Sequence, residues 1–78
     1  MLTVTIINPD RVVYDGPAEY VLVPTVHGTL GVLPSHTPIF AEITKGQIEI
    51  QGSNPQQIEV ESGIMKVRSD ALTILIGF

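Results

Sequence analysis

The chain has 78 residues, a formal net charge of −4 and no cysteine. Domains usually run to about 100–150 residues, so we expect residues 1–78 to form a single domain, and the missing cysteines exclude disulfides and zinc–thiolate sites. The four basic residues are scattered, whereas nucleic-acid phosphates and anionic lipids are held by clustered Lys and Arg, so we expect neither kind of partner.

Short extended segments follow one another along the whole chain. In chain order they are expected at 2–7, 21–23, 39–45, 47–51, 57–61, 65–68 and 72–76. Apolar and polar residues alternate strictly in 47–51, 57–61 and 65–68, which predicts strands with one buried face. The segments 2–7, 21–23 and 72–76 are apolar on the second face as well, so we expect cover on both sides. The segment 39–45 is too short for a convincing helix and is interpreted as a strand.

Turn signals separate these segments, mostly at the spacing of about 8–12 residues that is typical of sandwiches and barrels. The signals are Asn8-Pro9-Asp10, Asp15-Gly16-Pro17, His27-Gly28, Pro34-Ser35, Lys45-Gly46, Gly52-Ser53-Asn54-Pro55, Ser62-Gly63 and Ser69-Asp70. The sequence therefore predicts an all-β fold, a flattened β-sandwich or barrel of eight to ten short strands.

The residues that could carry catalysis do not form a recognisable site. Ser35 and His36 are adjacent, but neighbours on an extended chain point to opposite sides, and the serine lacks a nucleophile elbow. A small hydrolase would remain an option only if Ser35 reacted with an active-site probe. We expect no catalytic residue.

Metal and cofactor sites are not indicated either. His27 and His36 stand nine residues apart, without the spacing of a zinc motif. The run Gly28-Thr29-Leu30-Gly31 lacks the lysine and the helix N-terminus of a phosphate loop, and its glycines suit a tight turn. Glu59 and Glu61 fit a solvated strand face. No metal ligand, cofactor or cofactor-binding residue is expected.

The most unusual segment is 28–40, GTLGVLPSHTPIF, which holds two glycines, two prolines, a histidine and the apolar pair Ile39-Phe40. Pro34 and Pro38 cannot donate to a strand ladder and therefore suit an edge or a bend. Such an apolar edge either closes the core or forms a contact surface, and the residues alone leave both possibilities open.

Within this segment, Gly28-x-Leu30-Gly31-Val32-Leu33-Pro34-x-His36-x-Pro38 resembles the signature of the epsilon subunit of F-type ATP synthase (delta in mitochondria), in its N-terminal β-sandwich domain. Further similar segments are Val12-Val13-Tyr14-Asp15-Gly16, Val21-Leu22-Val23-Pro24, Gly46-Gln47-Ile48-Glu49-Ile50, Ser62-Gly63-Ile64-Met65-Lys66-Val67 and Leu72-Thr73-Ile74-Leu75. The resemblance covers essentially the whole chain.

The resemblance implies a ten-stranded flattened sandwich that belongs to the central stalk, or rotor, and performs no bond chemistry. It implies two partners, the gamma subunit and the polar loops of the membrane c-ring, between which the domain couples rotation to proton-driven ATP synthesis. By position, Gly28, Thr29 and Leu30 match the c-ring-facing loop. The gamma-facing patch corresponds to His36, Thr37, Pro38 and Phe40.

The implied location is a peripheral membrane complex, at the cytoplasmic face of a bacterial inner membrane or its organellar equivalent. No apolar run approaches the roughly 20 residues that span a bilayer, and residues 1–5 lack the pattern of a secretory signal, so membrane contact is expected only through the complex.

The sequence departs from the family pattern at two positions. Ser35 stands where glycine or asparagine is usual, which bears on the local turn, and Thr29 replaces a commonly acidic residue, which bears on the c-ring contact. The family usually adds a C-terminal two-helix domain with inhibitory and, in some members, ATP-binding roles. Those roles cannot be assigned to these residues, and both a short member and a piece of a longer chain remain open.

A different class of function is a free-standing β-sandwich module that binds carbohydrate or peptide. Such modules often present aromatic platforms, whereas the aromatic residues here are Tyr14, Tyr20, Phe40 and Phe78, dispersed along the chain.

Overall fold

The computed structural model describes residues 1–35 and 37–77, and these residues form nine β-strands. The strands are β1 (Leu2–Ile7), β2 (Val12–Ala18), β3 (Tyr20–Thr25), β4 (Gly28–Val32), β5 (Ile39–Ile43), β6 (Gly46–Gln51), β7 (Gln56–Val60), β8 (Gly63–Arg68) and β9 (Ala71–Ile76). The all-β prediction is confirmed. No helix capable of crossing a bilayer occurs in the described part of the chain.

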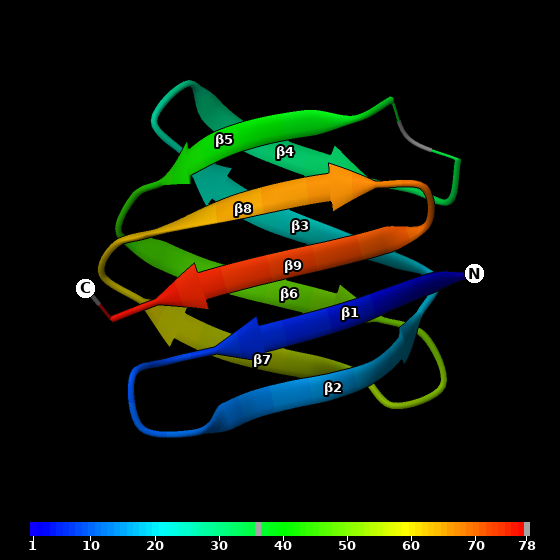
Figure 1. Cartoon of the computed structure of the whole chain (residues 1–78), viewed down its shortest axis with the longest axis horizontal. Coiled ribbons are helices and arrows are strands. Elements are labelled where there is room, and N and C mark those ends of the chain that lie inside the picture. The colour runs from blue at the N-terminus through cyan, green and yellow to red at the C-terminus, as the bar shows by residue number, and fades with distance from the viewer. Residues whose placement is uncertain (36, 78) are drawn as a thin grey trace.

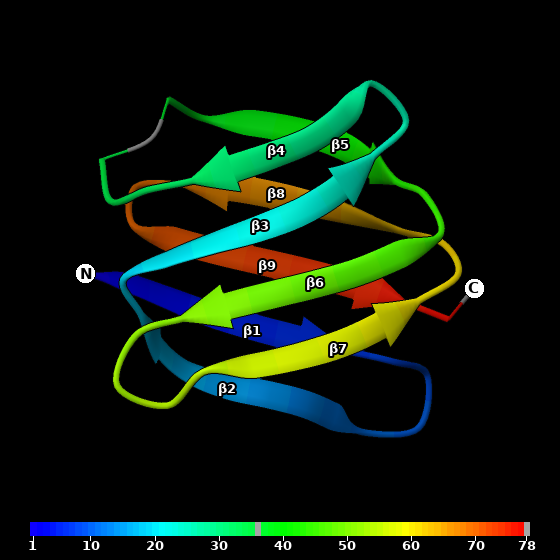
Figure 2. The ribbon, with the colours of Figure 1, turned by 180° about the vertical axis from the view of Figure 1, so that it is seen from behind.

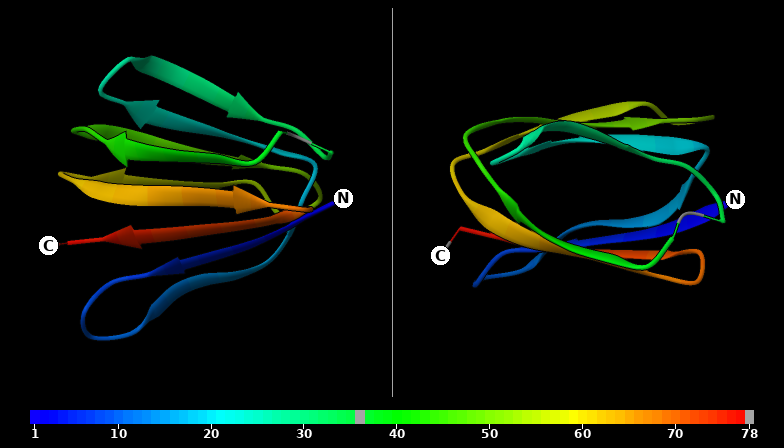
Figure 3. Two further views of the ribbon diagram at one scale, coloured as in Figure 1. Left: turned by 45° about the horizontal axis from the view of Figure 1, so that its top comes forward. Right: turned by 90° about the horizontal axis from the view of Figure 1, so that it is seen from above.

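The strands lie in two layers that face each other (Figures 1 and 2). The front layer has the order β2-β1-β9-β8-β5, and the back layer consists of β4, β3, β6 and β7. Seen edge on, the layers form a flattened sandwich, as Figure 3 shows. The pairing of β1 with β9 is parallel, and the other pairings are antiparallel.

The two layers are joined at one corner, where β3 meets β5. Thr25 pairs with Ile43 there, the Val26 N–H donates to the Glu42 carbonyl at 3.1 Å, and the Thr44 N–H donates to the Pro24 carbonyl at 2.9 Å. Because of this corner, the tip of the β3–β4 hairpin is held against the end of β5.

The core lies between the layers and is lined by every second residue of the strands, as the two-residue period requires. Its buried apolar residues are Leu2, Val4, Ile6, Ala18, Val21, Val23, Val32, Ile43, Ile48, Ile50, Val60, Met65, Val67, Leu72, Ile74 and Ile76. The strands predicted at 47–51, 57–61 and 65–68 are confirmed, and β5 confirms the strand predicted at 39–45, although it ends at Ile43.

The prediction that 2–7, 21–23 and 72–76 are covered on both sides is wrong for the described residues. The alternate side chains Ile7, Leu22 and Leu75 lie on outer faces of the sandwich and are half-buried. A two-layer structure buries only the faces that look toward each other, so apolar residues on the outer faces remain open to contact.

The turn predicted at Asp15-Gly16-Pro17 is also wrong, because all three residues lie inside β2. Strand β2 is at the end of the front layer, where a proline can be tolerated although it donates no ladder hydrogen bond. The Tyr14 hydroxyl donates to the Pro17 carbonyl at 2.9 Å, which holds the strand locally.

Candidate interaction surfaces

The first predicted surface lies at the tip of the β3–β4 hairpin. The turn consists of Val26 and His27, and Gly28 follows it with φ +110°, a value that favours glycine. Gly28, Thr29 and Leu30 were predicted as a turn or loop, but they begin β4 and pair with Thr25, Pro24 and Val23 of β3. The prediction is corrected because the chain reverses at Val26 and His27, one residue before the predicted turn at His27 and Gly28.

A single buried hydroxyl organises this tip. The Thr25 hydroxyl donates to the Gly28 carbonyl at 2.6 Å and accepts from the His27 N–H at 3.2 Å. The side chain of Val26 is 50% exposed and that of Thr29 is exposed as well. The tip therefore presents a small, mostly uncharged surface on a turn that the Thr25 hydroxyl stabilises by hydrogen bonds.

The second surface is the outer face of β5, β8 and β9 in the front layer. Phe40 is 69% exposed there, opposite Lys66 in the neighbouring strand. It borders a hollow of about 420 Å³ that is also lined by Ile64, Leu75 and Arg68. The apolar surface of an aromatic ring this exposed is removed from water only when a partner covers it.

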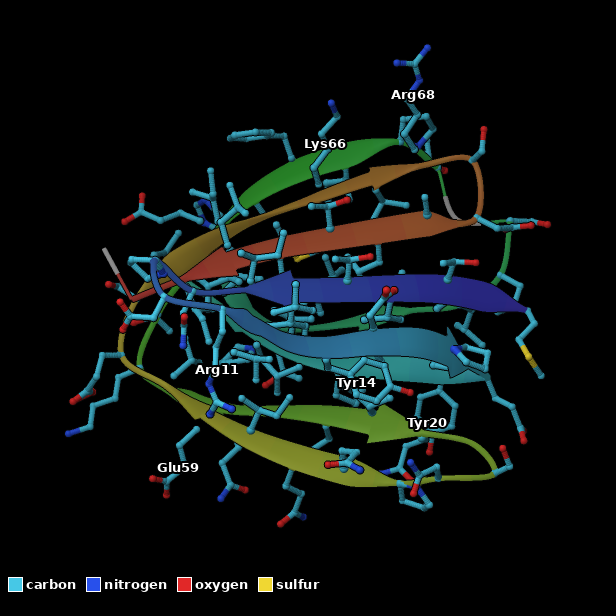
Figure 4. The ribbon with its side chains drawn as sticks, turned by 60° about the horizontal axis from the view of Figure 1, so that its bottom comes forward. Arg11, Tyr14, Tyr20, Glu59, Lys66 and Arg68 are labelled. Carbon is cyan, nitrogen blue, oxygen red and sulfur yellow. The ribbon has the colours of Figure 1, made fainter. Side chains whose placement is uncertain are left out.

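Two of the four basic residues of this acidic chain lie on the same face. Lys66 and Arg68 are two positions apart on β8, so both point outward, as Figure 4 shows. The face combines exposed apolar groups with positive charge, which suits a protein partner that brings both apolar and acidic side chains.

The predicted gamma-facing residues are only partly placed on this face. Pro38 and Phe40 line a second hollow of about 400 Å³ together with Lys66 and Arg68. Thr37 is exposed beside them, and His36 lies outside the described residues.

Phe40 also connects the two surfaces. A third hollow, of about 340 Å³, lies between the hairpin and β5 and is lined by Gly28, Thr29 and Leu30 as well as Phe40. Sequence reasoning missed Ile64, Lys66, Arg68 and Leu75 as members of the second surface. The signal that could have found them is the alternation of 64, 66 and 68 on one face of a strand, together with the second apolar face of 72–76.

The remaining candidate residues that the structure describes do not come together in one site. Ser35 is exposed in the connection between β4 and β5, and Glu59 and Glu61 are exposed at the end of β7. Among residues 1–35 and 37–77 no group of three or more His, Cys, Asp or Glu side chains could hold a metal ion.

Residues 1–77 match the family model described as "ATP synthase, Delta/Epsilon chain, beta-sandwich domain". The chain is 41% identical over 75 residues to the ATP synthase epsilon chain of Alkalihalophilus pseudofirmus, covering 95% of this chain and 56% of that one. It is 36% identical over 77 residues to the epsilon chain of Synechococcus elongatus, covering 97% and 56%. The chain thus spans little more than half the length of these relatives.

Two solved structures share the fold. One is the Euglena gracilis mitochondrial ATP synthase, OSCP/F1/c-ring, with a TM-score of 0.89 at 19% identity, covering 96% of this chain and 49% of the matched one. The other is the central stalk/c-ring of the Tetrahymena thermophila mitochondrial ATP synthase, with a TM-score of 0.82 at 14% identity and coverages of 99% and 63%.

Proposed function

The chain belongs to the family of the β-sandwich domain of ATP synthase delta/epsilon chains, and from this premise we propose that it is a non-catalytic part of the synthase rotor. It acts as one domain over residues 1–78 and couples the gamma subunit to the c-ring during proton-driven ATP synthesis. The observation that carries the proposal is the match of residues 1–77 to the family model. The complex places the chain at the membrane surface, on the cytoplasmic side of a bacterial inner membrane or its organellar equivalent.

The gamma subunit binds the outer face of β5, β8 and β9. Support comes from Phe40, which is 69% exposed, and from the apolar Ile64 and Leu75 beside it. Lys66 and Arg68 border the same area and provide charge that an acidic partner would meet. Thr37 and Pro38 extend the patch just ahead of β5. His36, which the resemblance assigns to the same patch, lies outside the described residues.

The c-ring loops contact the hairpin residues Gly28, Thr29 and Leu30. Support comes from the exposure of the hairpin tip and from its attachment to the end of β5 by the Val26 N–H bond to Glu42. A rotor element must not deform under load. A core packed between two hydrogen-bonded layers meets this requirement, since protein interiors are close-packed and poorly compressible.

The test is a calorimetric titration of the gamma subunit with the chain and with Phe40→Asp. Because burying a Phe side chain contributes about 1.5–3 kcal/mol, we expect the affinity to fall by about 10- to 150-fold. The free energy of unfolding should stay within about 0.5 kcal/mol of the unmodified chain, since the ring is mostly in solvent.

The matched control is Val12→Asp, which places the same charge on another exposed apolar position, 54% exposed, in edge strand β2. Its affinity for gamma should be unchanged. Equal affinities for Phe40→Asp and the unmodified chain would reject the gamma face. Retention of glycans or peptides by a chain that binds no rotor subunit would instead favour the free-standing module.

A further inference from the structure

Two connections far apart in sequence meet beside the N-terminus, at the end of the molecule opposite the hairpin tip (Figure 1). One is the turn Ser69-Asp70 between β8 and β9, and the other is the stretch 33–35 that follows β4. The Asp70 carboxylate accepts a hydrogen bond from the Ser35 N–H at 2.7 Å. The Asp70 backbone carbonyl accepts another from the Thr3 N–H at 2.8 Å, so Asp70 is itself attached to β1.

The backbone at Ser35 is in a conformation that needs support. Its φ is +64°, in the left-handed region that disfavours residues with a Cβ atom. Hydrogen bonds to an ionised carboxylate are shorter and stronger than neutral ones, and 2.7 Å is at the short end of their range. The bond from Asp70 is therefore suited to offset the unfavourable conformation of Ser35.

The backbone conformation of Ser35 bears on the second surface, because Ser35 precedes the residues of that surface in the chain. Only residues 36–38 separate it from Ile39, the first residue of β5, and Pro38 restricts the backbone of the residue before it. Ser35 thus stands only three positions before Pro38 and five before Phe40 in the chain.

We propose that Asp70 is a positioning residue: its carboxylate holds the Ser35 amide and thereby fixes the backbone conformation of Ser35, a few residues before Pro38 and Phe40 in the second surface. The positioning is a property of this chain alone. Its effect on gamma binding rests on the function proposed above. Asp70 acts through Ser35 and is not assigned any contact with the partner.

The first test is the exchange rate of the Ser35 amide proton, measured by NMR on the isolated chain. Asp70→Ala removes the acceptor, and we expect exchange to become about tenfold faster. Asp70→Asn keeps an acceptor oxygen and should recover most of the protection. Asp10→Ala, which removes an exposed carboxylate from the β1–β2 connection, is the matched control and should change nothing. An unchanged rate in Asp70→Ala overturns the proposal.

The second test uses Ser35→Gly, because glycine adopts positive φ without the steric cost. Asp70→Ala should weaken gamma binding by about tenfold when residue 35 is serine and by clearly less when it is glycine. Equal losses in both backgrounds would mean that Asp70 does not act by supporting the positive φ of residue 35, and would overturn the proposal. If the unmodified chain does not bind gamma, the proposed function fails, and the amide exchange alone decides the positioning role.

Discussion

Replacing Gly63 by alanine tests how closely β8 and β9 approach each other. Gly63 is buried at the start of β8 and pairs with Ile76 of β9. A Cβ atom there would collide with the Leu75 carbonyl oxygen and lie 3.1 Å from the Ile76 Cα and 3.2 Å from its Cγ2. Gly63 is not among the glycines with positive φ, so the obstacle is space and not backbone conformation.

The cost should lie near the upper end of the overpacking range. Inserting a methyl group into a packed site usually costs about 1–3 kcal/mol, and here the nearest atom belongs to a backbone that the ladder holds in place. We therefore expect a loss of about 3 kcal/mol. The total free energy of unfolding of a chain of this size is about 4–12 kcal/mol, so the fraction of it that is lost is large. The corresponding decrease in Tm is about 12–24 °C.

The assay is thermal and urea unfolding followed by far-UV circular dichroism. Gly31→Ala is the matched control, because its Cβ would meet only the Leu22 Cδ2 at an ordinary 3.5 Å and its φ is not positive. We expect this control to be neutral or to stabilise by up to about 1 kcal/mol. A loss below about 1 kcal/mol for Gly63→Ala would refute the close approach of the two strands.

Two further predictions concern the hairpin tip. Thr25→Val removes the hydroxyl that bridges His27 and Gly28 and should lower the free energy of unfolding, measured with urea, by about 1–2 kcal/mol. Thr25→Ser keeps a hydroxyl and should retain most of the stability. Equal losses for the two variants would contradict the role of the hydroxyl. Thr29→Trp adds bulk to an exposed position and should reduce co-sedimentation of the gamma-bound chain with purified c-ring without altering unfolding. Ser53→Trp, in the exposed β6–β7 turn, is its control, and undiminished co-sedimentation of Thr29→Trp would argue against the c-ring assignment.

Much of the strand pattern could be predicted because alternation is a local property. Ile48 and Ile50, or Met65 and Val67, point to one side of their strands whatever their neighbours are, and the structure buries all four. Glycine and proline were less reliable as indicators of turns. Gly28 does have positive φ, whereas Gly16 and Pro17 lie within an edge strand, since the position of a strand in its sheet decides whether a proline is tolerated.

The candidate surfaces could be predicted only in part. The 28–40 segment was recognised from its unusual composition and its resemblance to a family, and the family is confirmed. Lys66, Arg68 and Leu75 were not assigned to a surface, because their proximity to Phe40 arises from the pairing of β5, β8 and β9.

The sequence by itself determined the fold class, the alternation of buried and exposed residues, and the family. Tertiary structure alone decided which outer face carries the exposed Phe40, why residue 63 must be glycine, and that Asp70 reaches Ser35 across 35 positions of the chain. The physical reason is range: propensity and periodicity act between neighbours in sequence, whereas these three features depend on contacts that exist only after the layers have folded together.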